Sequence, residues 1–88
     1  MKVYSMTSPR TGNAVANQFE IYDTDKRYFQ SYNSVICLIQ SNEKTQLDRK
    51  YWDYSRTTTK YLCQFLRETK KEIVAKIKSG EYVLTNLN

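Results

Sequence analysis

The sequence predicts an α+β domain, an antiparallel β-sheet of about four to five strands with two C-terminal helices packed on one face, in the order ββββααβ. Two observations predict this fold. Apolar and polar residues alternate along much of the first half of the chain, as they do in half-buried strands. After residue 55 the apolar residues recur at helical spacing. The 88 residues suffice for a single domain, 1–88, with one core.

The first two strands are expected at residues 1–6 and 14–22. In the second of these, Val15, Phe19 and Ile21 fall on one side of an alternating pattern, which asparagine interrupts at position 17. This alternation is typical of a half-buried strand whose apolar side faces the core.

Residues 27–40 carry the strongest strand signal. The segment ends in a continuous apolar run, which suits a central strand covered on both faces, and Asn33 and Ser34 mark a bulge or bend within it. Residues 45–51 form a weaker strand whose charges suit a sheet edge. Turns are expected between the strands, at residues 7–13, 23–26 and 41–44.

The helical half begins near Asp53 or Ser55, either of which can cap the first turn. Two helices are expected, at residues 56–67 and 70–79, and residues 81–87 read as a last short strand.

Local signals mark the limits of the second helix. Thr69 and Glu72 match a capping box, and Gly80 fits the position after the last turn. One continuous helix is the alternative, because four apolar residues also keep heptad spacing: Leu62, Leu66, Ile73 and Ile77.

The net charge of +5 favours an anionic partner, either nucleic acid or an acidic protein surface, although such a charge also serves solubility alone. The chain has no histidine, which removes the commonest general base and most zinc sites. Its two glycines form no phosphate-binding loop. We therefore expect a protein that is not an enzyme and that has no catalytic residue, no cofactor and no metal.

The remaining side chains that could take part in catalysis or bind a metal have simpler structural interpretations. Cys37 and Cys63 lie in apolar neighbourhoods and are expected to be reduced, buried thiols, with a disulfide as the alternative. Asp23 and Asp25 lie in a turn. Asp53 is expected to cap a helix or to pair with an arginine three residues later.

The N-terminal residues lack the apolar stretch of a signal peptide, and no run of the chain is long enough to span a membrane. A cytoplasmic location, in the producing cell or in a host, is therefore expected, with no membrane partner.

Residues 51–60 join the strand half to the helical half, and they concentrate aromatic and basic side chains. Trp52 and Tyr54 can either seal the core or present a stacking surface, and their position at the joint favours packing. The cations around them are the better candidates for contact with a partner.

Two functions fit these features. The first is nucleic-acid binding, because bases stack on aromatic rings while lysine and arginine neutralise phosphates. The second is a protein-binding module, with the edge strand at 45–51 available to pair with a partner's sheet. The candidate binding residues for either function are Arg27, Tyr28, Arg49, Lys50, Trp52, Tyr54, Arg56, Lys60, Lys70 and Lys71.

Four segments, at 28–36, 51–58, 65–66 and 71–73, together resemble a group of small uncharacterised proteins from phages and mobile elements. The resemblance covers most of the chain and carries no assigned activity, so it assigns no site residue. It implies an accessory protein that binds nucleic acid or host machinery. In the second case the protein would inhibit or modulate a host enzyme or defence complex, as anti-CRISPR and anti-restriction proteins do.

Overall fold

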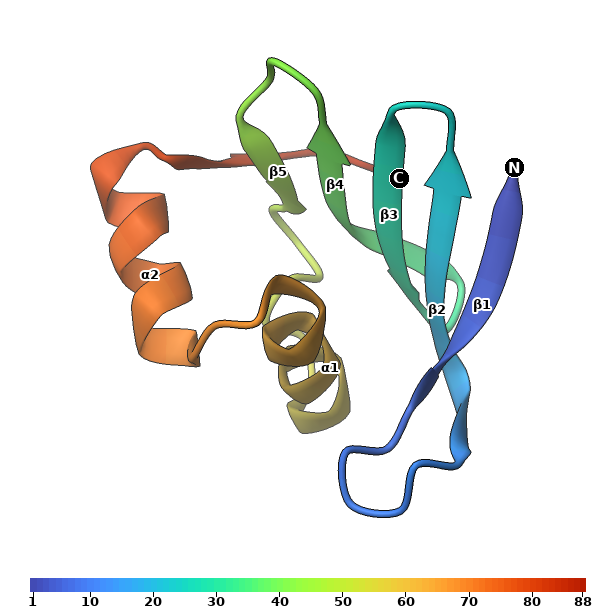
Figure 1. Cartoon of the computed structure of the whole chain (residues 1–88). Coiled ribbons are helices and arrows are strands. Elements are labelled where there is room, and N and C mark those ends of the chain that lie inside the picture. The colour runs from blue at the N-terminus through green and yellow to red at the C-terminus, as the bar shows by residue number, and fades with distance from the viewer.

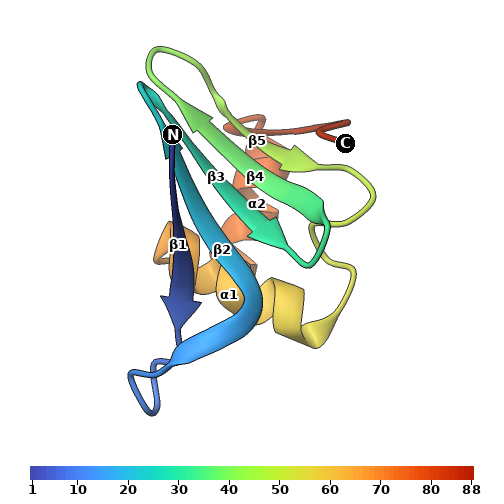
Figure 2. The same ribbon diagram turned by 90° about the vertical axis from the view of Figure 1, so that its right-hand side faces the viewer.

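A computed structural model describes all residues, 1–88, as one six-stranded mixed sheet with two helices on one of its faces (Figures 1 and 2). The strands lie in the sheet in the order in which they occur in the chain. The elements are β1 (Lys2–Thr7), β2 (Ala14–Asp23), β3 (Lys26–Ser31), β4 (Ser34–Gln40), β5 (Thr45–Asp48), α1 (Arg56–Leu66), α2 (Lys70–Ser79) and β6 (Tyr82–Thr85).

The sheet is not purely antiparallel, as the sequence predicted, because β6 pairs with β5 in parallel. The two helices carry the chain from the end of β5 back past its start, and such a crossover makes the next strand parallel. The expectation of an edge strand at 45–51 is therefore wrong. β5 ends at Asp48 and lies between β4 and β6, so its backbone is paired on both sides.

The strand expected at 27–40 is a hairpin of two strands, β3 and β4, and this hairpin raises the strand count above the expected number. Ser31 pairs with Ser34, so Tyr32 and Asn33 form a two-residue turn. The backbone of Tyr32 is left-handed, with a φ of 56°. That conformation is typical of tight hairpin turns, but it is uncommon for tyrosine, and the sequence therefore indicated only a bend.

The predicted orientation of β2 is wrong over its second half. Asn17 takes a left-handed φ of 65°, and the pairing of β1 with β2 is irregular beside it. Because a bulge shifts the alternation by one residue, the side chains that follow it change faces. Gln18 is consequently buried under the helices with no exposed surface, whereas Phe19 and Ile21 lie on the opposite face.

Both helices form as predicted, and the alternative of one continuous helix is wrong. Ser55 rather than Asp53 caps α1, and its side chain accepts a hydrogen bond from the Thr58 N–H. The α1 helix ends at Arg67, whose φ of 57° turns the chain out of the helix. The capping box of α2 and its terminal Gly80, with a φ of 85°, are both present. Neither helix has the length and apolar character of a membrane span.

The core lies between the sheet and the helices. Phe29 of β3 stacks on Phe65 of α1 with 5.8 Å between ring centroids, and both rings are buried. Leu47 of β5, Leu62 of α1 and Ile73 of α2 are fully covered beside them. The last short strand expected at 81–87 is confirmed as β6, which pairs with β5, and its Tyr82 joins this core.

The other face of the sheet is bare (Figure 2). Because successive residues of a strand point to opposite faces, residues that alternate with the core residues line the bare face. The strand pairings bring one such residue from each strand into a continuous row, which we call the bare-face row: Val3, Ile21, Tyr28, Leu38, Gln46 and Val83.

Asp48 ties the ends of β5 and β6 together. Its exposed fraction is 1%. One carboxylate oxygen accepts hydrogen bonds from the Lys50 and Tyr51 N–H groups at 3.1 and 2.9 Å, and the other accepts one from the Leu87 N–H at 2.8 Å. Burial by itself would raise the pKa of the Asp48 carboxyl, but these donors outweigh it and hold the pKa below its usual value.

We expect Asp48→Asn to lower the free energy of unfolding by about 2 kcal/mol at pH 7, since the amide group cannot accept all three hydrogen bonds. The folded-state pKa of Asp48 is depressed, so its contribution is complete above the unfolded value near 3.8 and is lost as the pH falls through the folded value. Urea denaturation of both proteins from pH 7 to pH 2 measures this. A stability difference that does not shrink with acid contradicts the ionised role of Asp48.

We expect Gln18→Met to raise the free energy of unfolding by about 1 kcal/mol, because both polar atoms of the Gln18 amide are buried without a partner. Methionine has a similar length and needs no hydrogen bond. Thermal and urea denaturation of the variant measure the change. A loss of stability would mean that the Gln18 amide is satisfied, for instance by an internal water.

Candidate nucleic-acid interface

The chain turns sharply between β5 and α1. The Trp52 N–H donates to the Asp48 carbonyl at 3.0 Å, and the Tyr54 N–H donates to the Tyr51 carbonyl at 3.2 Å. Trp52 is half-buried and packs against the core, as predicted. Tyr54 does not pack as predicted, because its exposed fraction is 72%. The turn directs these two rings differently, so only Tyr54 is free to stack on a ligand.

A groove of about 450 Å³ surrounds the start of α1. Tyr54 and three cations line it, namely Arg56, Lys60 and Lys70. Asp53 also lies in the groove, where it pairs with Lys70 at 3.1 Å and accepts a hydrogen bond from the Thr59 hydroxyl. The expectation that Asp53 pairs with Arg56 or caps the helix is therefore wrong, and Arg56 makes no ion pair.

Two further tyrosines extend this region. The rings of Tyr51 and Tyr54 meet edge to face with centroids 5.6 Å apart, and the Lys50 ammonium lies 5.3 Å from the Tyr51 centroid. Tyr51 and Tyr54 also line a second hollow, of about 370 Å³, together with Tyr32 from the β3–β4 turn. Tyr32 is 52% exposed. Three rings and several cations thus lie side by side.

We call this combined region the hinge surface and define it by Tyr32, Lys50, Tyr51, Tyr54, Arg56, Lys60 and Lys70. Tyr32 was not among the candidates chosen from the sequence. An aromatic residue followed by asparagine and serine is consistent with a tight turn, and that signal could have indicated an exposed ring.

The other candidates chosen from the sequence lie elsewhere. Arg27 points to the helix-covered face, where its guanidinium carbon lies 4.9 Å from the Phe65 centroid. Tyr28 belongs to the bare-face row. Arg49 lines a separate hollow after β5, and Lys71 is exposed on α2. The structure therefore divides the predicted set instead of gathering it on one surface.

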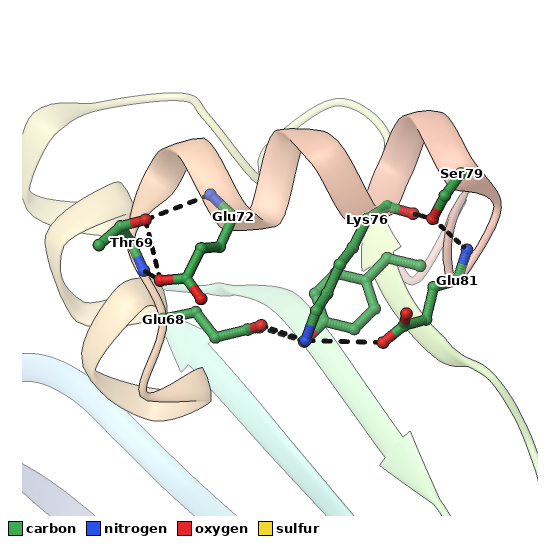
Figure 3. Close-up of polar contacts among 7 residues, drawn as sticks. Glu68, Thr69, Glu72, Lys76, Ser79 and Glu81 are labelled. Carbon is green, nitrogen blue, oxygen red and sulfur yellow. Dashed lines mark hydrogen bonds and ion pairs between the residues drawn. The ribbon is translucent and has the colours of Figure 1, made fainter.

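A second polar cluster joins α2 to β6 (Figure 3). Glu68, in the turn between the helices, accepts a hydrogen bond from the Tyr82 hydroxyl and pairs with Lys76. Lys76 also pairs with Glu81 at 3.5 Å, and its ammonium lies 5.2 Å from the Tyr82 centroid. The cluster holds the last strand against the second helix.

The electrostatics of this cluster favour a structural role. Burial, followed by the hydrogen bond to Glu68, raises the pKa of Tyr82 to about 12. The hydrogen bond to Glu68 raises the pKa of Lys76 above its usual value. A neutral phenol and a firmly protonated amine do not serve as a general base at neutral pH.

The other side chains that could be reactive, two cysteines and two aspartates, also have structural surroundings. Cys37 is buried and free, as expected, and burial raises the pKa of its thiol to about 12. Cys63 is free but only half-buried, and burial raises its pKa as well. Asp23 ends β2, and Asp25 lies in the following turn.

We expect Glu68→Gln to lower the free energy of unfolding by about 1–2 kcal/mol at pH 8, because it weakens the hydrogen bond to the buried Tyr82 hydroxyl. The folded-state pKa values of Tyr82 and Lys76 are both raised. The stability that they contribute is thus complete below their ordinary values of 10.0 and 10.5, and it is lost as the pH rises through the folded values.

Urea denaturation of the wild type and of Glu68→Gln between pH 8 and pH 12 tests this. The stability difference is expected to shrink above pH 10, where Tyr82 and Lys76 begin to lose their protons in the unfolded state. Glu81→Gln is the control, since Glu81 is exposed and its loss should cost less than about 0.5 kcal/mol. A difference that stays constant with pH would show that the charge of Glu68 is not what matters.

Residues 1–83 match a protein family of unknown function, DUF8033, and the chain belongs to that family. No curated protein and no solved structure matches the chain.

Proposed function

We propose that this DUF8033 protein is a non-enzymatic binding protein that holds nucleic acid, with a preference for single strands, on the hinge surface. The observation that carries the proposal is the exposure of Tyr54, at 72%, beside the cations of the α1 groove. Proteins bind single-stranded nucleic acid through aromatic rings that are open to solvent and flanked by cations.

The rings supply the stacking part of the proposed interaction. Tyr32 and Tyr54 line one hollow and are both more than half exposed, so their faces are accessible to unstacked bases. The edge-to-face contact with Tyr51 restrains Tyr54 before any ligand arrives. A restrained ring loses less conformational freedom on binding than a free one does.

The cations supply the electrostatic part. Arg56 and Lys60 are exposed and make no ion pair in the groove. Lys70 is partly neutralised by Asp53, so a phosphate would compete with that carboxylate. Phosphates neutralised by the free cations would release counterions, which makes binding sensitive to salt.

We expect micromolar or weaker binding of single-stranded DNA or RNA that weakens steeply with added salt. Tyr54→Ala should weaken binding by about 1–3 kcal/mol through the loss of one stacked base. Arg56→Gln and Lys60→Gln should each weaken binding of all sequences and lower the salt slope by about 1. Fluorescence anisotropy with single- and double-stranded probes at two salt concentrations measures all three variants.

Two control variants are needed. One tests whether the aromatic ring itself is required, and the other tests whether the position of a charge matters or only the net charge of the protein. Tyr54→Phe keeps the ring and should retain binding, and Lys78→Gln removes one exposed charge of α2 outside the hinge surface. The proposal is wrong if no probe binds at low salt, or if Lys78→Gln weakens binding as much as Lys60→Gln does.

A protein-binding module is the second candidate, and the bare-face row favours it. The row carries no charge, and its Val3 and Val83 side chains are 57% and 39% exposed. An uncharged surface of this kind suits an apolar protein surface and has no cation to neutralise a phosphate. A pull-down from nuclease-treated host lysate that Val3→Lys abolishes would support this function over nucleic-acid binding.

The resemblance to small phage and mobile-element proteins supports an accessory role for either function. Under the second function, the partner would be a host enzyme or defence complex in the cytoplasm, which the protein would inhibit or modulate.

A further inference from the structure

A cavity of about 830 Å³ lies between the helix-covered side of the first three strands and the end of α1. We call it the β1–α1 cavity. Its volume is within the range of small-ligand pockets, about 300–1,000 Å³. It lies at the opposite end of α1 from the groove of the hinge surface, because Gln64, Phe65 and Arg67 line it.

The cavity is cationic. Lys2, Arg27 and Arg67 line it and are opposed by a single carboxylate, Glu20. The nearest Glu20 oxygen lies 3.7 Å from the Arg27 guanidinium, which is beyond hydrogen-bond distance. Glu20 and Arg27 form an ion pair at this distance, and the three cations outnumber the one carboxylate, so the lining keeps an excess of positive charge.

The Arg27 guanidinium is held in place, and it has N–H groups that make no hydrogen bond. Its guanidinium lies over two rings, 4.9 Å from the Phe65 centroid and 5.4 Å from the Tyr22 centroid. Its Nε atom is buried and has no partner. The two rings and the Glu20 carboxylate therefore orient the guanidinium. The buried Nε is closed to a ligand, but the side chain is 42% exposed, so its terminal nitrogens can contact an anion.

Arg67 occupies a position that normally favours glycine. Its φ of 57° is left-handed, and it ends α1 in the same way that Gly80 ends α2. The chain thus uses glycine at one helix end and an exposed arginine at the other, where the backbone conformation is strained for any side chain. Arg67 lines the cavity, so contact with a ligand would account for an arginine at this strained position.

The remaining lining suits a planar, polar group. Tyr4, which is 50% exposed, meets Tyr22 edge to face with centroids 5.6 Å apart. The Gln64 amide nitrogen donates to the Thr7 carbonyl at 2.9 Å, which fixes the orientation of that amide. Its oxygen is buried without a partner, so the Tyr4 ring is the part of this lining that a ligand can reach.

We propose that the β1–α1 cavity binds a nucleoside monophosphate. The phosphate contacts Lys2, Arg27 and Arg67, and the base lies against the Tyr4 ring. The same chemistry comes from two sources, a free nucleotide or the terminal phosphorylated nucleotide of a strand. The site and the hinge surface share no residue, so this proposal stands apart from the proposed function.

Arg67→Gly is the decisive variant, because a structural and a binding role predict opposite effects. Glycine relieves the left-handed strain, so the melting temperature should stay the same or rise. The loss of a charged donor should weaken binding of AMP and UMP about tenfold or more, as measured by calorimetric titration. Lys78→Gln removes the same charge outside the cavity, and Tyr54→Ala alters only the hinge surface. Both controls should bind the monophosphates normally.

Two further binding measurements distinguish a free nucleotide from the phosphorylated end of a strand. Binding of AMP or UMP that exceeds binding of inorganic phosphate, with no gain from a 5′-phosphate on a tetranucleotide, supports a free nucleotide. A 5′-phosphorylated tetranucleotide that binds better than its dephosphorylated form, with the gain lost in Arg67→Gly, supports a strand end. The proposal is overturned if neither monophosphates nor the phosphorylated strand bind, if inorganic phosphate binds as well as AMP, or if Arg67→Gly binds normally.

Discussion

The buried carboxylate of Asp48 is the interaction on which the rest of the structure depends. It lies where β5 ends, and it accepts hydrogen bonds from the turn that follows and from the backbone just after β6. Without this acceptor, three partly buried N–H groups at the junction of two strands would lose their protein partner. The direction in which the chain leaves the sheet, and with it the position of Tyr54, follows from this one side chain.

The sequence predicted well whatever depends on neighbours in the chain. The capping box at Thr69, the glycine after α2 and the apolar spacing of both helices are local signals, and each was confirmed. The half-buried Trp52 was also correctly expected to pack. These features need only a few adjacent residues to specify them, so periodicity and capping rules suffice.

The failures came from single residues with an uncommon backbone conformation or environment. Asn17 and Tyr32 both have a positive φ, and each redirects the strand pattern around it. Asp48 was expected to be a charge on a sheet edge. One of its hydrogen-bond donors is the N–H of Leu87, which is far along the chain, so the sequence around Asp48 does not reveal its burial. The exposure of Tyr54 could not be predicted for the same reason, since it depends on the turn that Asp48 organises.

The two cationic sites lie apart from the bare-face row. The hinge surface and the β1–α1 cavity both carry cations and lie at the two ends of α1, whereas the bare-face row has none. Both cationic sites lie on the helical side of the molecule, so an anionic ligand is expected to approach that side. The opposite face remains free for a contact that is based on shape and apolar area.

The parallel pairing of β6 with β5 also determines the order in which the fold can be completed. The first five strands pair antiparallel with their neighbours in the chain, so they can assemble as successive hairpins soon after each is synthesised. The sixth strand must wait for both helices, because 33 residues lie between the end of β5 at Asp48 and the start of β6 at Tyr82. Contacts between residues so distant in sequence form slowly. Until they form, the edge of β5 stays open, and the newly made sheet is most exposed to pairing with the wrong partner.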